Sequence, residues 1–275
     1  MAANQKYALV TGATNGIGYE LAKLLAQDGY NLVIVARSQE ELDQKAAEFK
    51  DQYGIEVFPL AKDLFRREAP FEVYEAVKAQ GIQVDVLVNN AGQGQYGEFV
   101  ETDINRELDI IQLNIVTYVV LTKCFLQEMV ARGSGKILNV SSIGGEIPGP
   151  LQSVYHGTKA FVTSFTEAIR SEVKDQNVII TALLPGATET DFFHKAQMEE
   201  SKLVKEGSLA DPAKVAKDGY EALLANQDKV VSGLKNKAMV AASNLLPDEV
   251  VADQMHKQAE PSQEGESKPQ GSSNS

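Results

Sequence analysis

The chain has few of the residues from which metal sites and covalent crosslinks are built. It has 275 residues, with no tryptophan, one cysteine, Cys124, and three histidines, His156, His194 and His256. A single cysteine excludes an intrachain disulfide, and the spacing of the histidines does not match a zinc site, so we expect no metal. Because Cys124 lies in an apolar helical stretch, we expect its thiol to serve in packing and not in chemistry.

Positive charge is also scarce. The 26 lysines and arginines are outnumbered by 38 aspartates and glutamates, which gives a formal net charge of -12. An acidic surface repels phosphate backbones and anionic lipid, so we expect neither nucleic acid nor a membrane surface as the main partner. Small anionic ligands remain compatible with this charge, because a helix N-terminus attracts them locally.

Long apolar runs are lacking too, although 43% of the residues are hydrophobic. The best candidate, residues 115–126, is interrupted by Thr117, Thr122 and Lys123 and is shorter than the ~18 residues of a membrane span. The N-terminus already reads as a strand at residues 6–11, so we expect no signal peptide. A cytoplasmic location is the resulting expectation.

Apolar strand-like runs alternate with longer helical patterns along most of the chain. The predicted strands are residues 7–11, 32–36, 57–60, 84–89, 136–140, 178–184 and 229–232. The predicted helices are residues 17–27, 40–53, 71–79, 104–131, 154–174 and 212–225. The strands are almost continuously apolar, which is typical of strands covered on both faces. The pattern therefore predicts an α/β fold with one Rossmann-type, doubly wound parallel sheet of about seven strands and helices on both faces.

The first strand ends in a glycine-rich turn, Thr11-Gly-Ala-Thr-Asn-Gly-Ile-Gly18, and a helix follows. Gly12 permits a sharp turn, Gly16 permits close approach of backbone to a pyrophosphate, and Gly18 permits close packing of helix on strand. The following helix N-terminus presents free N–H groups to an anion. The alternative is a glycine turn without a ligand, but its position at the first strand–helix junction favours phosphate binding.

This turn resembles the cofactor motif of the short-chain dehydrogenase/reductase family. Further family motifs follow in order over about residues 5–235, namely Asp63-Leu64, Asn89-Asn90-Ala91-Gly92, Asn114, Ser142, Tyr155, Lys159 and Pro185-Gly186-Ala187-Thr188-Glu189-Thr190. The resemblance implies a single NAD(P)-binding reductase domain over residues 1–255 with a substrate lid at about 187–207. The segment 256–275 is poor in core-forming side chains, and we expect a disordered tail there.

Tyr155 and Lys159 are the central catalytic candidates. Residues i and i+4 share a helix face, and a neighbouring ammonium favours the phenolate, so we expect the pKa of Tyr155 to fall below its usual ~10. The resemblance implies that Tyr155 protonates the carbonyl oxygen and that Lys159 holds the nicotinamide ribose. It also implies that Ser142, thirteen residues before Tyr155, bonds the reacting oxygen and that Asn114 helps to hold a proton-relay water.

Alternatives to these roles come from the same residues. Ser141 is the adjacent hydroxyl, with strand-end capping as its simpler role, and Asn114 without the resemblance is a buried amide bonded to backbone. His156 follows Tyr155, but neighbouring helix residues point to different faces, so we expect it to turn away from the site. The other Tyr-x-x-x-Lys pairs, which begin at Tyr19 and Tyr74, are expected to be surface or packing residues.

The end of the second strand indicates the preferred nicotinamide cofactor. NAD sites usually place an acidic residue there, whereas this chain has Ala36 followed by Arg37 and Ser38. A guanidinium pairs well with a 2′-phosphate, so we expect NADPH (NADP) to be preferred, with NADH possible. The alternative is that Arg37 stacks on adenine or faces solvent.

The resemblance also implies the remaining cofactor contacts. The expected cofactor-binding residues are Gly12, Thr14, Asn15, Gly16, Ile17, Gly18, Arg37, Ser38, Asp63, Leu64, Asn90, Ala91, Gly92, Tyr155, Lys159, Pro185, Gly186, Thr188 and Thr190. Asp63 suits a helix N-cap equally well. We expect Asn89 to tie neighbouring strands together.

The sequence says less about which residues contact the substrate. Phe192 and Phe193 lie in the expected lid and either turn toward the substrate or pack as an ordinary amphipathic helix. Gln93, Gln95 and Tyr96 follow the fourth strand and are candidates to line the same crevice. These residues indicate a small-molecule carbonyl or alcohol substrate with an apolar flank.

The sequence therefore predicts an NADPH-dependent oxidoreductase that moves hydride between the cofactor and a ketone or aldehyde, or runs the reverse alcohol oxidation. A catalytically silent NADPH-binding regulatory protein and a nucleotide-sugar epimerase or dehydratase are the alternatives. By analogy with the family, a homodimer or homotetramer is expected through the two long helices around residues 104–132 and 154–174.

Overall fold

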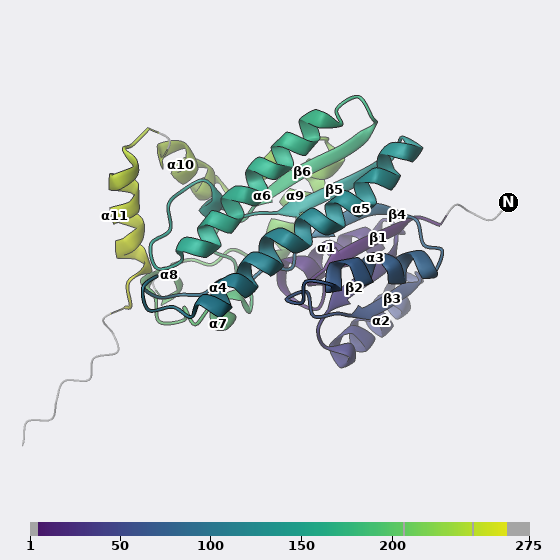
Figure 1. Cartoon of the computed structure of the whole chain (residues 1–275), viewed down its shortest axis with the longest axis horizontal. Coiled ribbons are helices and arrows are strands. Elements are labelled where there is room, and N and C mark those ends of the chain that lie inside the picture. Colours follow the sequence, from purple (N-terminus) through teal and green to yellow (C-terminus); the bar gives the residue numbers. More distant parts are fainter. Residues whose placement is uncertain (1–4, 206, 244, 263–275) are drawn as a thin grey trace, which may run out of the picture.

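The computed structural model describes residues 5–205, 207–243 and 245–262, which form one seven-stranded parallel sheet with helices on both faces (Figure 1). The strand order is β3-β2-β1-β4-β5-β6-β7, and every pair of neighbours is parallel. From β1 the chain first winds outward to β3 and then returns to β4 beside β1. That reversal makes the carboxyl ends of β1 and β4 the topological switch point, where doubly wound sheets bind ligands. The predicted fold class is confirmed.

The strands are β1 (Tyr7–Thr11), β2 (Asn31–Ala36), β3 (Val57–Ala61), β4 (Val84–Asn89), β5 (Gly135–Val140), β6 (Val178–Leu184) and β7 (Lys229–Val231). The main helices are α1 (Gly16–Gln27), α2 (Gln39–Tyr53), α3 (Ala69–Ala79), α4 (Ile104–Ile111), α5 (Thr117–Arg132), α6 (Ser153–Glu172) and α9 (Pro212–Leu224). Each predicted strand is confirmed to within one residue. The predicted helices are confirmed to within two residues, except that one long helix is divided into α4, a π-helical turn over Gln112–Val116, and α5.

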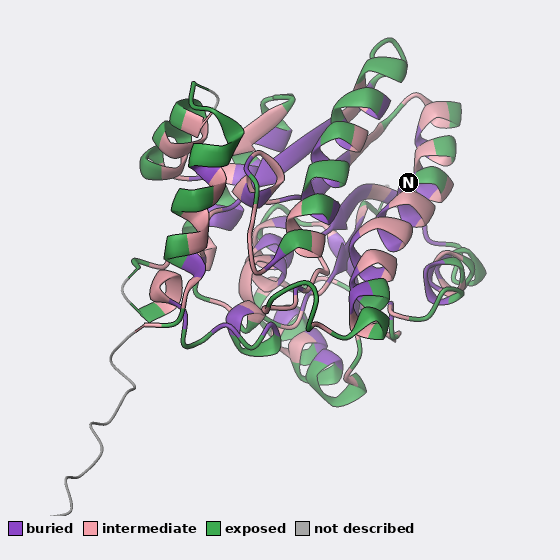
Figure 2. Ribbon diagram, turned by 60° about the vertical axis from the view of Figure 1, so that its left-hand side comes forward, coloured by how far each residue is buried: buried purple, intermediate pink, exposed green. Residues whose placement is uncertain are grey.

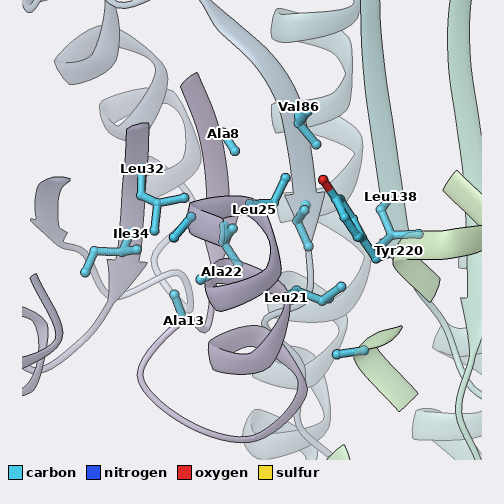
Figure 3. Packing of buried hydrophobic residues seen from close by; sticks show 14 of the residues in the cluster. Ala8, Ala13, Leu21, Ala22, Leu25, Leu32, Ile34, Val86, Leu138 and Tyr220 are labelled. Atoms are coloured by element: carbon cyan, nitrogen blue, oxygen red, sulfur yellow. The ribbon is translucent and has the colours of Figure 1, made fainter. Parts of the chain in front are cut away.

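One face of the sheet is covered by α1, α2 and α9. Their apolar side chains, such as Leu21, Leu25 and Tyr220, pack on strand residues such as Ala8 and Leu138 (Figure 3). Burying one such side chain stabilises the fold by roughly 1.5–3 kcal/mol. This packing fixes the position of α1, whose N-terminus follows the glycine turn.

The other face is covered by α3, α5 and α6. Leu121, Phe125 and Met129 of α5 are fully buried against this face. By length and composition alone, Ile104–Arg132 is apolar enough to cross a membrane, which corrects the expectation that no segment would qualify. In the fold its buried side chains face the sheet core, so packing accounts for their apolar character. Figure 2 shows the buried strands enclosed by helices whose outer faces are exposed.

A chain of buried amides and hydroxyls runs through this second face. Asn89 Nδ2 on β4 donates to Asn139 Oδ1 on β5 at 2.9 Å and to Thr122 Oγ1 on α5 at 3.0 Å. Asn139 in turn donates to Thr166 Oγ1 on α6 at 2.9 Å. Buried polar groups are stable only when paired, so these bonds fix the register of two strands and two helices. Asn89 has the strand-tying contacts expected of it.

Three features differ from the sequence-based expectations. Two helices at the C-terminal end, α10 (Leu234–Ser243) and α11 (Asp248–Ala259), have no counterpart in the prediction. The predicted start of a disordered tail at residue 256 is wrong, because α11 continues to Ala259; the part of that tail from residue 263 lies outside the described residues. The lid contains two four-residue helices, α7 (Phe192–Lys195) and α8 (Lys202–Lys205).

The end of α11 is attached to the lid and to the loop after β4. The Tyr96 hydroxyl donates to the Ala259 carbonyl oxygen at 2.6 Å. Lys202 Nζ forms an ion pair with Glu260 at 2.8 Å, and the Lys202 N–H donates to the Glu260 carbonyl oxygen at 2.9 Å. These contacts join segments that are far apart in sequence, so α11 belongs to the same folded unit as the sheet.

Candidate active site

A cavity of about 1310 Å³ opens at the carboxyl ends of the strands. Most of the predicted site residues line it, namely Gly12, Thr14, Asn15, Gly16, Ile17, Arg37, Ser38, Asp63, Leu64, Asn90, Ala91, Gly92, Gln93, Ser142, Tyr155, Lys159, Pro185, Gly186, Thr188, Thr190, Phe192 and Phe193. Gly18, Gln95, Tyr96 and Asn114 are outside this lining, so the expectation that Gln95 and Tyr96 line the crevice is wrong. The fold therefore brings residues from nearly all of the predicted motifs together around one cavity.

The glycine turn has the backbone that the sequence predicts. Gly12 and Gly16 have φ of +66° and +55°, in the left-handed region that favours glycine. A Cβ on Gly18 would lie 2.1 Å from the Gly12 carbonyl oxygen, so this position requires glycine for the close contact of α1 with the turn. Asn15, the residue before α1, makes no capping bond with its side chain, and its amide instead donates to Asp191 at 2.8 Å.

Asn90 connects the glycine turn to the end of β4. Its Nδ2 donates to the carbonyl oxygens of Thr11 at 2.9 Å and Gly12 at 3.1 Å. Its backbone N–H and that of Ala91 both donate to Thr11 Oγ1. The side chain of Asn90 therefore links the ends of β1 and β4 at the switch point. The expected contact of Asn90 with the cofactor did not include this structural role.

Arg37 lies at the end of β2 with its side chain exposed. Its guanidinium lies 5.8 Å from the centre of the Phe65 ring, and among the described residues no carboxylate forms an ion pair with it. Ser38 caps α2, accepting from the Glu41 N–H at 3.2 Å. Asp63 Oδ1 accepts from the Phe65 N–H at 3.2 Å, in the manner of a local cap.

Ser142, Tyr155 and Lys159 meet at the cavity wall. The ammonium of Lys159 lies 5.8 Å from the Tyr155 ring centre and donates to the Val140 carbonyl oxygen at 2.9 Å. The Ser142 hydroxyl donates to the Pro185 carbonyl oxygen at 3.5 Å and is close enough to the Tyr155 phenol to lower its pKa. Ser142 Oγ also accepts from the Gly144 N–H at 3.0 Å, which fixes its direction. Helix α6 and the end of β5 thus bring two hydroxyls and an ammonium together.

The expectation that the pKa of Tyr155 is lowered is wrong. Burial raises the pKa of Tyr155 to about 12, against a smaller lowering effect of the Ser142 hydrogen bond. Burial also lowers the pKa of Lys159 to about 7. Desolvation disfavours the charged form of both groups.

Asn114 lies in the π-helical turn and is fully buried. Its Nδ2 donates to the Gln93 carbonyl oxygen and to Thr158 Oγ1, both at 2.9 Å, and its Oδ1 accepts from the Gln93 N–H at 3.1 Å. Both amide hydrogens are therefore used within the protein. These bonds attach the loop after β4 to α6, which matches the alternative of a buried amide. A π-helical turn often marks a functional site, and the sequence periodicity did not reveal it.

The two neighbours of the candidate pair have structural contacts. His156 also lines the cavity, contrary to the expectation that it turns away, and its Nδ1 bonds the Ile147 carbonyl oxygen at 2.9 Å. Burial lowers the pKa of His156. Ser141 is buried and donates to the Lys159 carbonyl oxygen at 2.8 Å. Ser141 is thus occupied inside the fold, whereas Ser142 faces the phenol.

The lid contributes an aromatic wall. The Phe192 ring lies against the Tyr155 ring at a tilt of 50°, with ring centroids 4.9 Å apart, whereas Phe193 is buried in a small cluster with Ala196 and Met198. Phe193 therefore has the packing role, although it also reaches the cavity lining; contact of either ring with the substrate stays a prediction. Tyr96 packs on the same cluster, and its hydroxyl donates a hydrogen bond to Ala259 at the end of α11. Its side chain therefore contacts the lid but does not line the cavity.

Gly94 and Gln152 were missed by the sequence analysis. A Cβ on Gly94 would lie 3.0 Å from Phe192 Cζ, 3.3 Å from Tyr155 Cγ and 3.3 Å from Gln152 Nε2. The absent side chain lets these three groups approach one another. A glycine two residues after the Asn-Asn-Ala-Gly motif was the available signal, but no local pattern indicates which distant side chains would meet there.

Comparisons with known proteins agree with this geometry. A family model described as short chain dehydrogenase matches residues 6–201. The very-long-chain 3-oxoacyl-CoA reductase of Anas platyrhynchos is 38% identical over 185 residues, covering 65% of this chain and 58% of that protein. The reductase of the same name from Bos taurus is 37% identical over 186 residues, covering 66% and 58%. The chain thus spans less than two thirds of the length of these curated relatives.

Solved structures show the same fold. A short-chain dehydrogenase from Sphingobium yanoikuyae in complex with NADPH has a TM-score of 0.79 and 27% identity, covering 87% of this chain and 93% of that one. The L-sorbose reductase of Gluconobacter frateurii, complexed with NADPH and L-sorbose, has a TM-score of 0.74 and 26% identity, covering 85% and 98%.

Proposed function

The chain belongs to the short-chain dehydrogenase family, and from this premise we propose that it is an NADPH-dependent reductase that converts a ketone or aldehyde to an alcohol. The observation that carries the proposal is the convergence of Ser142, Tyr155 and Lys159 on the cavity that the glycine turn also lines. A hydroxyl pair and an ammonium suit proton donation to a carbonyl oxygen.

The residues present fit a dinucleotide. The positive φ angles of Gly12 and Gly16 leave the turn without side chains where a pyrophosphate would approach, and the N-terminus of α1 has no side-chain cap. Unpaired N–H groups and the helix dipole favour an anion there. When bound, the reduced nicotinamide supplies a hydride to the carbonyl carbon.

The chain's own residues supply the proton. Because its pKa is raised to about 12, the Tyr155 phenol is protonated at neutral pH, as an acid for carbonyl reduction must be. The phenol gives its proton to the carbonyl oxygen, which becomes the hydroxyl of the product. With its pKa at about 7, Lys159 is partly protonated at neutral pH; its protonated form stabilises the phenolate left behind, and solvent restores the proton to Tyr155. Ser142 orients the reacting oxygen by hydrogen bonding.

Arg37 supports a preference for NADPH. Its guanidinium lines the cavity and has no carboxylate partner among the described residues, so it is available to a 2′-phosphate. Glu41 lines the cavity as well, and its negative charge opposes that contact. We propose that Arg37 prevails, because Arg37 follows β2 directly, where the adenine ribose of a bound dinucleotide is expected.

A 3-oxoacyl thioester is the substrate class that we propose. The relatives' names support it, and so does the cavity, whose apolar lining includes Phe192, Leu203, Met239 and Met255. The exposed side chains of Lys214, Lys235 and Lys257 also line the cavity. An acyl chain would pack on the apolar wall, and the anionic carrier of a thioester would face the lysines.

We further propose a single reductase domain that includes α11, and association through α4 and α6. Ile104 and Leu108 on α4 are 60% and 54% exposed, and Phe161 on α6 is exposed as well. Apolar side chains on two neighbouring helices suit contact with a second copy of the chain. Light scattering of wild type and Leu108→Asp tests this association: a mass of two or more chains that falls to one supports it.

The proposed function is tested by incubating the protein with NADPH and a series of 3-oxoacyl thioesters, and following the loss of NADPH absorbance. The expected result is turnover that Tyr155→Phe removes while NADPH binding is retained. Binding of NADPH without turnover of any carbonyl substrate would favour a regulatory protein. Redox-neutral conversion of a nucleotide sugar would favour an epimerase.

A further inference from the structure

Gln152 has a buried side chain whose amide nitrogen has no partner. The residue is 7% exposed, and Nε2 has no hydrogen-bond partner among the described residues. The same side chain lines the cavity. An unpaired buried donor destabilises a fold, so a group of this kind suggests a partner that is absent from the protein alone.

Gln152 is an unusual residue for its position directly before α6. It precedes the first residue of α6, a position where Ser, Thr, Asp and Asn are favoured because they cap the helix, yet its side chain makes no capping bond. Leu151 before it has φ of +64°, which is rare for a residue with a branched side chain. The Leu151 carbonyl oxygen accepts from the Gly97 N–H at 2.9 Å, which holds this conformation.

Gln152, directly before α6, and Tyr155, in the first turn of α6, approach the same point. Gln152 Nε2 and Tyr155 Cγ each lie 3.3 Å from the position that a Cβ on Gly94 would occupy. Phe192 Cζ lies 3.0 Å from the same position. The ring atom nearest this point is Cγ, opposite the phenol oxygen, so the Gln152 amide lies on the side of the ring away from the proton donor. A substrate whose ketone oxygen accepts the Tyr155 proton would therefore reach the amide with a group further along its chain, beside the Phe192 ring.

We propose that Gln152 determines specificity by donating a hydrogen bond to a second carbonyl oxygen of the substrate, one carbon removed from the reacting ketone. This rests on the proposed function, and it identifies the thioester carbonyl of a 3-oxoacyl substrate as the group recognised. A substrate with that oxygen pairs the buried amide. A simple ketone leaves the amide unpaired, and sites of this kind discriminate strongly against such analogues.

The test compares two substrates that differ only in this group. Ethyl 3-oxohexanoate has the second carbonyl, and 4-nonanone replaces the ester by a chain of the same length. For Gln152→Leu we expect kcat/KM to fall about 10- to 100-fold with the oxoester and to change less than about threefold with the ketone. Gln152→Glu keeps the size and one acceptor but loses the donor, so the same selective loss is expected.

Gln95→Leu is the matched control. The Gln95 side chain also has a buried atom without a partner, its Oε1, but it does not line the cavity. This variant should leave the ratio of kcat/KM for the two substrates unchanged. Thermal unfolding gives a second readout: removal of an unpaired amide should leave the Tm of Gln152→Leu equal to or above that of wild type.

Three results would overturn the assignment. Equal losses on both substrates would make Gln152 a general structural residue. A weaker NADPH dissociation constant in Gln152→Leu would assign the amide to the cofactor. Unchanged kinetics with both substrates would show that the amide has no role in turnover. If wild type reduces neither substrate nor any thioester with NADPH, the proposed function itself fails, which is a distinct outcome.

Discussion

The ring of Phe192 lies against the ring of Tyr155, with the two centroids 4.9 Å apart and the planes inclined by 50°. Phe192 begins a short helix of the lid, and Tyr155 is on α6 beside the sheet. The contact therefore joins the expected substrate lid to the candidate proton donor. It also contributes to the burial that raises the pKa of Tyr155.

Phe192→Ala removes this ring and should lower kcat/KM for an apolar ketone by roughly five- to tenfold, since one aromatic contact is worth about 1 kcal/mol. The loss should appear mainly in KM, because the ring touches the substrate side and transfers no proton. Phe192→Leu should recover most of it. Steady-state kinetics of the three proteins decide the matter, and an unchanged KM would show that Phe192 does not contact substrate.

Arg37→Ala should weaken NADPH binding by about 10- to 100-fold and change NADH binding by less than about threefold, because it removes one charge-assisted contact to the 2′-phosphate. Fluorescence titration measures both dissociation constants. Arg66→Ala is a suitable control, since Arg66 pairs with Glu72 at 2.9 Å and does not line the cavity. Equal weakening of both cofactors would mean that Arg37 only stacks on the adenine.

The buried Lys159 should make stability depend on pH. Its pKa is lowered from 10.5 to about 7 in the folded chain, so between pH 7 and 10.5 the unfolded chain binds more protons and stability rises with pH. Lys159→Met removes this contribution. The difference in free energy of unfolding, wild type minus variant, should therefore be roughly 2–3 kcal/mol larger at pH 9 than at pH 6. Urea unfolding at both values measures it; a difference that does not vary with pH would contradict the assigned shift.

Gly18→Ala should prevent nucleotide binding and destabilise the fold by more than about 2 kcal/mol, because its Cβ would lie 2.1 Å from the Gly12 carbonyl oxygen and 2.3 Å from Asn90 Nδ2. Gly157→Ala provides the contrast. Gly157 is exposed within α6 with open space around it, and alanine there should stabilise the helix by about 0.5–1 kcal/mol. Thermal unfolding of both variants tests the pair, and a well-tolerated Gly18→Ala would contradict the close contact.

The sheet and its main helices could be predicted because their signals are local. Continuous apolar runs such as residues 32–36 indicate strands with both faces covered, and the motif residues follow those strands at recognisable spacing. Helices α10 and α11 escaped prediction because their buried surface is small, with only Val251 and Ala259 of α11 buried. Their order depends on long-range contacts such as Tyr96 with Ala259, which no local pattern encodes.

The sequence predicts which residues form the site, but not the direction in which their pKa values shift. Spacing places Tyr155 and Lys159 on one helix face, yet the sign of the Tyr155 pKa shift depends on how far the surrounding segments bury it. Gln152 illustrates the same limit, because its unpaired amide lies beside Gly94, fifty-eight residues earlier in the chain.

The most direct test of the central claim is the turnover of Tyr155→Phe with NADPH and ethyl 3-oxohexanoate, measured beside its NADPH dissociation constant. The account predicts that turnover falls about 10²- to 10⁴-fold, the usual contribution of a general acid, while the dissociation constant stays within about twofold. Turnover that survives at the wild-type rate would contradict the assignment of Tyr155 as the proton donor.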